Sequence, residues 1–519
     1  MRVESFLTDS VRRSPDKVAV IAGERHFSFS ELDEQSQRLA ATLVAGGVQR
    51  GDRVIVFMDN CWEAVVSIFA VLRAGAAFSP VNPTTKSDKL AYMLANCRAS
   101  ALLTLDNLLP VAARALETVP SVRLVVATGQ GDGPRLGRTF LRYEAAISGS
   151  AASTPLPPAG IELDIAMLIY TSGSTGMPKG VVMTHQNVVA AAASITTYLE
   201  SAPDDIVLNV LPISFDYGLY QVLMSVKVGA TIALEKSFAF PRAILDRANR
   251  IGATGLPLVP TMAALLLQMK DLRPGTLPSL RYITNTAAAL PPAHIVRLQE
   301  LFPHARLFSM YGLTECKRCT YLPPSELATR PGSVGIAIPG TEAWIVDDQG
   351  NRVGPHVPGE LVIRGPHVMK GYWENEEATS RALKAGPLPW EKVLYTGDLF
   401  RTDEDGFLYF VARKDDIIKS RGEKISPKEV ETVLYALAGI REAAVIGVPD
   451  PVLGASLKAV VALEPGAGLG RTDVLRHCAA HLEDFMVPKM VEFWDDLPKS
   501  DNGKIDRRSV AETAGRPTT

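Results

Sequence analysis

The chain has 519 residues, 47% hydrophobic and 21% charged, which excludes disordered and fibrous proteins and allows two to four domains of about 100–200 residues each. Its 54 Lys and Arg residues against 56 Asp and Glu residues give a formal net charge of -2, so no overall positive field exists to bind nucleic acid or an anionic membrane surface. Five cysteines in this length indicate reduced thiols instead of a disulfide framework.

The N-terminal segment carries charges throughout and lacks the apolar stretch of a secretory signal, so we expect a cytoplasmic protein. The most apolar long stretch, residues 64–80, is interrupted by Arg73 and Gly75 and falls short of the ~20 uncharged residues that a membrane span needs. We therefore expect no transmembrane segment.

Strands and helices alternate in the first part of the chain, which is typical of βαβ units in a parallel sheet. The predicted strands are 53–58, 77–81, 101–105, 122–128 and 165–170, and the helices between them include 62–73 and 87–97. A second α/β pattern runs from about 205 to 307, with strands predicted at 206–212, 230–234 and 281–285.

The pattern changes near residue 332 to strand, turn and strand, with a turn at 348–350. After residue 416 the chain reads as a small α+β unit, with helices at 426–437 and 471–481 and strands at 442–448 and 457–463. We thus predict an α/β fold: an N-terminal domain over 1–412, made of two doubly wound α/β subdomains and a β-rich subdomain from about 332, then a C-terminal α+β domain over 416–519.

The clearest functional signal is YTSGSTGMPKG at 170–180, directly after an apolar strand. Such a loop can turn backbone N–H groups and hydroxyls toward phosphate oxygens, and Lys179 adds a positive charge. It is not a Walker P-loop, because Gly180 follows the lysine where that motif has Ser or Thr.

This loop resembles the nucleotide loop of the AMP-forming adenylating superfamily, which contains acyl-CoA synthetases, peptide-synthetase adenylation domains and luciferases. Further segments match that family in order: YGLTE at 311–315, GELVIRG at 359–365, YTGD at 395–398, RKDDIIKSRGEKISPKEVE at 413–431 and PKSDNGKIDRR at 498–508. Six matches in order identify the chain as a member.

The resemblance implies that an acid and ATP form an acyl-AMP with release of pyrophosphate, and that a thiol then displaces AMP. It assigns catalysis to Lys504, Thr314 and Glu315, with Glu315 also holding Mg²⁺. The implied ATP and AMP contacts are Thr171, Ser172, Gly173, Ser174, Thr175, Gly176, Lys179, Tyr311, Thr314, Asp398 and Arg413. Repulsion between the two anions explains why such cations and donors are needed.

Asp415 resembles the family's hinge residue, which places a hinge near 413–416 and makes the C-terminal domain mobile. In one orientation Lys504 would lie at the active site. After rotation about Asp415, a segment with Lys419, Arg421 and Gly422 would lie there instead and line a channel for the thiol. The acceptor is CoA or the phosphopantetheine of a carrier protein. No carrier domain follows residue 508, so we expect such a carrier to be a separate chain.

The implied substrate pocket is defined by Phe215, Asp216, Tyr220, Ala287, Met310, Arg318 and Cys319. The Phe-Asp pair is similar to the segment by which amino-acid-adenylating members contact the substrate ammonium. A buried aspartate needs a cation. Either Asp216 binds a substrate amine while Arg318 contacts a second polar group, or the two pair and the substrate is a neutral fatty or aromatic acid, or one or both face away.

Two readings outside this chemistry are a non-catalytic nucleotide-binding relative and an amide hydrolase using Lys179 with a loop serine. The intact Lys504, Glu315 and Thr314 argue against the first. The Cys316-x-x-Cys319 pair lacks two further nearby ligands for zinc, so we interpret it as ordinary thiols.

Overall fold

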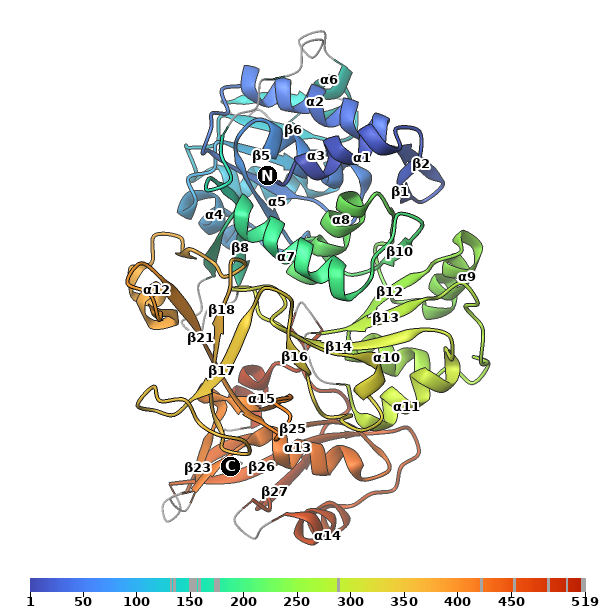
Figure 1. Cartoon of the computed structure of the whole chain (residues 1–519), viewed down its shortest axis with the longest axis vertical. Coiled ribbons are helices and arrows are strands. Elements are labelled where there is room, and N and C mark those ends of the chain that lie inside the picture. Colours follow the sequence, from blue (N-terminus) through green and yellow to red (C-terminus); the bar gives the residue numbers. More distant parts are fainter. Residues whose placement is uncertain are drawn as a thin grey trace.

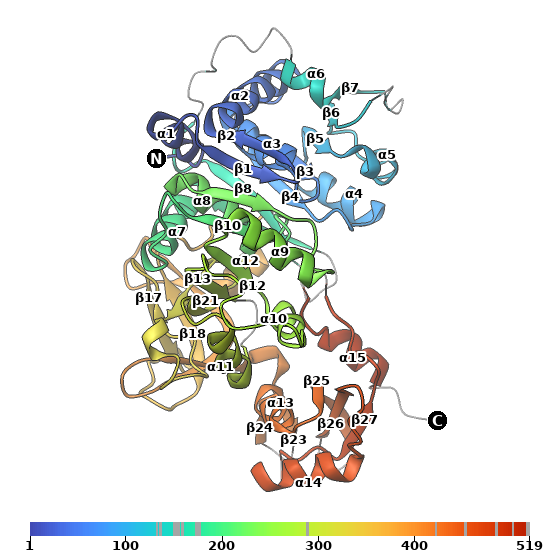
Figure 2. The same cartoon turned by 90° about the vertical axis from the view of Figure 1, so that its right-hand side faces the viewer.

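The computed structural model describes residues 1–130, 133, 137–148, 156, 160–171, 178–286, 290–420, 423–450, 454–482, 486–500 and 503–514. Two large sheets and a smaller antiparallel one form the upper body of the molecule, and the C-terminal elements lie below it (Figures 1 and 2). The mixed α/β fold predicted from the sequence is confirmed. None of the helices in the described ranges is long and apolar enough to cross a membrane.

The first sheet has eight strands, and the consecutive apolar residues of its central strands are buried because helices cover both faces. Strand β9 runs antiparallel to β8, and the strands from β8 to β7 pair in parallel. Its order is β19 (Gly371–Tyr372), β9 (Lys179–Thr184), β8 (Ile165–Thr171), β4 (Ala77–Val81), β3 (Arg53–Phe57), β5 (Ala101–Thr104), β6 (Leu124–Ala127) and β7 (Thr139–Arg142). The accompanying helices are α2 (Phe29–Ala45), α3 (Trp62–Arg73), α4 (Ser87–Asn96), α5 (Leu109–Leu116) and α6 (Tyr143–Ser148), with the 3-10 turn η1 (Asp106–Leu108).

The second sheet has nine strands in the order β16 (Ile336–Ala337), β15 (Thr320–Leu322), β14 (Arg306–Tyr311), β13 (Tyr282–Asn285), β12 (Gly255–Leu258), β10 (Ile206–Asn209), β11 (Thr231–Leu234), β1 (Val18–Ala22) and β2 (Arg25–Ser28). Its helices are α1 (Ser5–Arg13), α7 (His185–Tyr198), α8 (Asp216–Val228), α9 (Pro241–Ile251), α10 (Pro260–Leu267) and α11 (Pro292–Leu301). The sequence did not predict the β1–β2 hairpin. It joins this sheet because β1 pairs in parallel with β11, more than 200 residues away.

The β-rich segment after residue 332 forms the antiparallel sheet that the sequence predicted. Its strands are β17 (Glu342–Val346), β18 (Gly359–Arg364), β20 (Leu383–Ala385), β21 (Lys392–Thr402) and β22 (Leu408–Arg413), with α12 (Glu376–Ala382) and η3 (Pro324–Glu326) nearby in the chain. In the β21–β22 pair, Asp398 lies opposite Arg413. This register brings two sequence-predicted site residues together.

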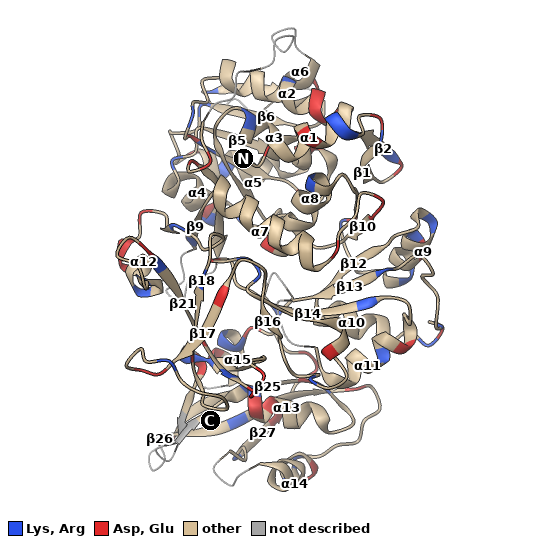
Figure 3. Cartoon of the chain, in the orientation of Figure 1, with Lys and Arg blue, Asp and Glu red and all other residues tan. Residues whose placement is uncertain are grey.

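The C-terminal elements follow the turn η4 (Lys414–Asp416) and pack around two small hydrophobic clusters of their own. They are β23 (Ile418–Ser420), β24 (Glu423–Ile425), α13 (Pro427–Ala436), β25 (Ile440–Asp450), β26 (Gly454–Leu463), α14 (Arg471–His481), β27 (Met490–Phe493) and α15 (Arg507–Ala514). Acidic and basic residues are interspersed over the chain (Figure 3).

Candidate active site

A buried carboxylate, Asp398, lies at the centre of the candidate site. The hydroxyl of Tyr311, at the end of β14, donates to its Oδ2 at 2.6 Å, and Arg413 Nε lies 3.4 Å from its Oδ1. Burial raises the pKa of Asp398, while Arg413, Tyr311 and Lys504 pull that pKa down. Tyr311 and Phe400 pack edge to face, with ring centres 4.8 Å apart, and this contact helps to hold the tyrosine ring beside the carboxylate.

Lys504, from the C-terminal domain, lies near enough to this carboxylate for its charge to lower the Asp398 pKa. The Ser500 N–H donates to the Lys504 carbonyl oxygen at 2.7 Å, closing a turn in which Gly503 has φ +75°. The Lys504 side chain is exposed, yet protein groups around it desolvate the ammonium and, with repulsion from Arg413, lower its pKa to about 8, against the attraction of Asp398. Thr261 of α10 approaches Gly503, so both domains meet at this point.

Glu315 and Lys179 both lie next to Tyr372. The Tyr372 hydroxyl donates to Glu315 Oε1 at 2.6 Å, and the Lys179 ammonium lies 5.5 Å from the centre of the Tyr372 ring. Thr314, beside Glu315, is partly buried. Tyr372 could not be predicted from the sequence, because it is 57 residues from Glu315 and belongs to none of the recognised motifs.

The two ends of the loop predicted to bind phosphate lie side by side in the first sheet. Thr171 at the end of β8 pairs with Lys179 at the start of β9. The residues between them that we predicted as ATP contacts, Ser172, Gly173, Ser174, Thr175 and Gly176, lie outside the described residues, as does Ala287.

Glu315 is the candidate ligand for a divalent cation. Its Oε1 accepts from Tyr372, and none of the hydrogen bonds between described residues occupies Oε2. Across the described ranges no group of three His, Cys, Asp or Glu side chains could hold a metal. The residues therefore fit a cation that takes one carboxylate from the protein and its other ligands from phosphates and water, as Mg²⁺ does.

A tight turn between β14 and β15 carries two of the predicted substrate-pocket residues, Arg318 and Cys319. Lys317 has a left-handed backbone (φ +66°), and a Cβ on Gly312 would lie 1.8 Å from the Lys317 carbonyl oxygen, so this turn requires glycine at 312. The sulfurs of Cys316 and Cys319 lie 2.7 Å apart in the same turn, and both residues are fully buried.

Asp216 pairs with a residue of this turn that we did not expect from the sequence. The fully buried Lys317 ammonium lies 2.6 Å from Asp216 Oδ1, so the alternative in which Asp216 pairs with Arg318 is wrong, and Asp216 has a protein cation without any substrate amine. The sequence predicted that a substrate or protein cation must face this carboxylate, but it did not point to Lys317.

Arg318 instead stacks on Tyr217, with its guanidinium carbon 4.6 Å from the ring centre. Tyr217 is held by hydrogen bonds of 2.7 Å to the Thr284 carbonyl and hydroxyl oxygens. The other predicted pocket residues surround this region or adjoin it in the chain: Tyr220 is buried, Phe215 precedes α8, and Met310 Sδ accepts from Tyr198 at 2.9 Å.

The predicted hinge and thiol-channel residues are described only in part. Asp415 lies in η4 and Lys419 in β23, but the description covers neither side chain, and Arg421 and Gly422 lie outside it. Next to the hinge, Arg507 of α15 pairs with Asp416 at 3.2 Å and Glu431 at 2.5 Å, contacts that the sequence did not predict.

Comparisons with known proteins agree with this geometry. The family model "AMP-binding enzyme" matches residues 7–373, and "AMP-binding enzyme C-terminal domain" matches residues 429–504. A long-chain-fatty-acid–CoA ligase of Bacillus subtilis (strain 168) is 33% identical over 535 residues, covering 98% of this chain and 94% of that protein.

Solved structures also align along nearly the whole chain. The ATP-bound MatB of Rhodopseudomonas palustris has a TM-score of 0.88 and 29% identity, with 99% of each chain covered. The anthranilate CoA ligase AuaEII in complex with anthranoyl-AMP has a TM-score of 0.89 and 26% identity, with 99% of this chain and 98% of that chain covered.

Replacement of Lys317 by methionine tests the buried pair. Lys317→Met leaves Asp216 without its cation, so we expect the free energy of unfolding to fall by about 2–4 kcal/mol, less than for a fully buried pair because Asp216 is partly exposed. Thermal unfolding measures the change. The double variant Lys317→Met/Asp216→Asn serves as the control and should recover most of the loss. A single variant as stable as the parent protein would contradict the pair.

Proposed function

The chain belongs to the AMP-binding enzyme family and is an AMP-forming acid–CoA ligase, and we propose how its residues divide the two half-reactions. In the first, a carboxylate attacks the α-phosphorus of ATP, forming acyl-AMP and releasing pyrophosphate. In the second, the thiol attacks the acyl carbon, AMP leaves, and the thiol proton is released. The observation that supports this division best is the meeting of Asp398, Arg413 and Lys504 across the two domains.

We assign the ribose to Asp398. Its two oxygens can each accept more than one hydrogen bond, so they can bind both ribose hydroxyls while they retain Tyr311 and Arg413. Tyr311 is the proposed stacking partner of adenine, and Arg413 the second donor to the ribose. The close contacts around Asp398 would hold the nucleoside in one pose while its α-phosphate reacts.

We assign charge stabilisation in the first half-reaction to Lys504, Lys179 and Thr314. The Lys504 ammonium would lie between the attacking carboxylate and the α-phosphate, where it offsets their repulsion and the growing negative charge. Thr314 would donate its hydroxyl to the α-phosphate, and Lys179 with the loop after β8 would bind the phosphates that leave. Mg²⁺, when bound at Glu315, would neutralise phosphate charge.

We propose that the second half-reaction needs another orientation of the domain over 416–519, with rotation at Asp415 in the 413–416 hinge. Lys504 would then leave the site, and Lys419, Arg421 and Gly422 would border the entering thiol. The CoA ligases among the relatives support CoA as the acceptor. A separate carrier protein bearing phosphopantetheine has the same reactive arm and is the alternative acceptor.

The acid pocket favours a substrate without an ammonium group. Since Lys317 already neutralises Asp216, a substrate amine would have to compete with a buried lysine for the same carboxylate. Amino-acid activation, which the Phe215-Asp216 sequence suggested, therefore loses its main support. The proposed substrate remains a carboxylic acid activated as its acyl-AMP.

Substitution of Lys504 separates the two half-reactions. In Lys504→Ala, acid-dependent exchange between ATP and pyrophosphate should fall by about 10²–10³-fold, because the developing charge loses its cation. Thioester formation from supplied acyl-AMP and CoA should fall far less, since Lys504 is absent from the second pose. Both rates are measured on the same preparation. An equal loss in both would contradict the assigned role.

The low pKa of Lys504 predicts the alkaline limb of the pH profile. The ammonium form is required, and it disappears as pH rises through about 8, so kcat/KM for ATP in the first half-reaction should decline above that pH. Lys504→Arg provides the control, because a guanidinium stays protonated. In that variant the limb should move upward by more than one pH unit, even if the rate is lower. An unchanged limb would assign it to another group.

A further inference from the structure

Arg318 is a buried cation that forms no ion pair with any of the described residues. Only 2% of the residue is exposed, and its Nε and Nη2 atoms have no hydrogen-bond partner among the described residues. Burial of a charge costs free energy unless an opposite charge or acceptors compensate it. The folded chain by itself therefore leaves this guanidinium incompletely satisfied.

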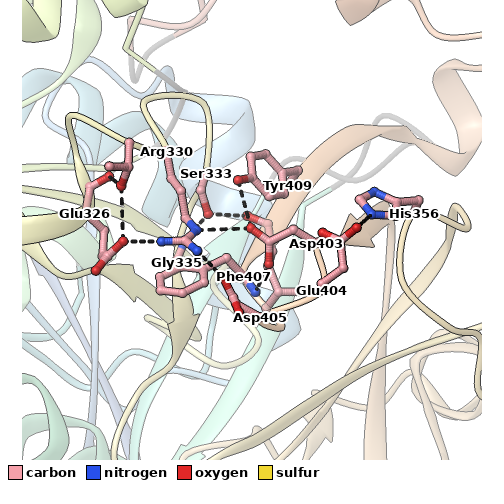
Figure 4. A network of polar contacts seen from close by, with 12 residues as sticks. Glu326, Arg330, Ser333, Gly335, His356, Asp403, Glu404, Asp405, Phe407 and Tyr409 are labelled. Atoms are coloured by element: carbon pink, nitrogen blue, oxygen red, sulfur yellow. Dashed lines mark hydrogen bonds and ion pairs between the residues drawn. The ribbon is translucent and has the colours of Figure 1, made fainter.

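The contrast with Arg330 shows how this protein compensates other arginines. Arg330 also stacks on a ring, that of Phe407 at 4.1 Å, but its guanidinium is surrounded by Glu326, Asp403 and Asp405 (Figure 4). Arg318 has the same kind of aromatic contact, but within the part of the chain that the structure describes no carboxylate pairs with it.

The two unsatisfied nitrogens of Arg318 lie on one edge of its fork. Nε and Nη2 point in the same direction, and a planar carboxylate can accept from both at once. Arg50 uses this same pair of atoms to bind Asp164, at 2.9 and 3.0 Å. The free edge of Arg318 thus has the geometry for one carboxylate.

The neighbours of Arg318 add positive charge and further donors. Lys317 and Arg318 bring two positive charges and Asp216 one negative charge, which leaves one positive charge uncompensated. The buried hydroxyl of Tyr220 is also without a hydrogen-bond partner, and it is close enough for Arg318 to act on its pKa. An incoming carboxylate would satisfy both the charge and these donors.

Arg318 is also placed near the reacting groups. It follows Glu315 by three residues, in the turn that leaves β14 just after Tyr311. It stacks on Tyr217, which is bonded to Thr284 of β13, the strand adjacent to β14. A molecule that extends from the nucleotide site into this region can present a second group to Arg318.

We propose that the acid activated here is a dicarboxylic acid, whose second carboxylate binds the Nε–Nη2 edge of Arg318 while the first is adenylated. This inference rests on the proposed function and specifies the substrate class of the same site. The ring of Tyr217, on which Arg318 stacks, and the nearby hydroxyl of Tyr220 would then border the bound carboxylate. Monocarboxylic acids leave the buried guanidinium unpaired and are discriminated against for that reason.

The first test compares matched acids in ATP–pyrophosphate exchange, with dicarboxylic acids from malonate to suberate beside monocarboxylic acids of equal carbon number. We expect kcat/KM to favour the best dicarboxylic acid by about 10²-fold or more. Arg318→Met should remove that preference by slowing dicarboxylic acids, and Arg318→Lys should retain part of it. A parent enzyme that favours monocarboxylic acids, or a preference that survives in Arg318→Met, would overturn the proposal.

The second test does not need turnover. Without ATP, dicarboxylic acids should raise the Tm of the parent protein and not that of Arg318→Met. In the absence of ligand, Arg318→Met should be at least as stable as the parent, because methionine keeps apolar packing and removes an uncompensated charge. Arg330→Met is the matched control and should be destabilised, because three carboxylates lose their partner. A clear loss of stability in unliganded Arg318→Met, or no dicarboxylate-dependent rise in the parent protein, would overturn the proposal.

The two tests separate this inference from the proposed function. Exchange with monocarboxylic acids alone would retain the ligase and reject the dicarboxylate site. Arg318-dependent stabilisation by dicarboxylic acids without any exchange would retain the site and reject the ligase reaction.

Discussion

The arrangement of the molecule around the candidate site depends on one constraint, the compensation of the buried charge of Asp398. Asp398 belongs to β21, but its partners come from the end of β14, from β22 and from the C-terminal domain. Because a buried charge must be compensated, these elements cannot separate without a cost in free energy. The same requirement makes the group a good acceptor for a polar ligand that enters between the domains.

Charge is distributed differently in the two halves of the candidate site. On the nucleotide side, the carboxylates of Asp398 and Glu315 alternate with the cations Arg413, Lys504 and Lys179, which suits a ligand that has both hydroxyls and phosphates. On the acid side, Asp216 and Lys317 neutralise each other, and Arg318 Nε and Nη2 have no hydrogen-bond partner among the described residues. The first half thus fits a component common to many adenylating reactions, and the second is the part that we propose discriminates among acids.

The packing is compatible with the proposed hinge motion. The C-terminal elements bury their apolar residues in clusters of their own, so they need little from the larger body to remain folded. The contacts that join the two bodies near the site are polar, such as the approach of Lys504 to Asp398 and Arg413. Lys504 is exposed, so its charge can return to water, whereas Asp398 retains Tyr311 and Arg413 when the C-terminal domain moves away, which is what the proposed two-pose cycle requires.

Most of the local structure could be read from the sequence. The helix 471–481, five strands of the first large sheet and three of the second follow from periodicity and apolar runs, which depend on neighbours in the chain. The β1–β2 hairpin could not be placed, because its pairing with β11 depends on a surface formed by residues far away in the chain. The role of Tyr372 could not be predicted for the same reason, because its contact with Glu315 joins residues that are far apart in the sequence.

The sequence by itself determined the fold class, the order of the nucleotide motifs and the need for a cation beside Asp216, since these follow from local patterns and from the cost of burying a charge. Only the tertiary structure decided which cation that is. Lys317 and Arg318 are adjacent, and the left-handed backbone at Lys317 helps to set which of them reaches α8. Side-chain direction in such a turn depends on the packing of β14, β15 and α8, and that packing left Arg318 with a free edge.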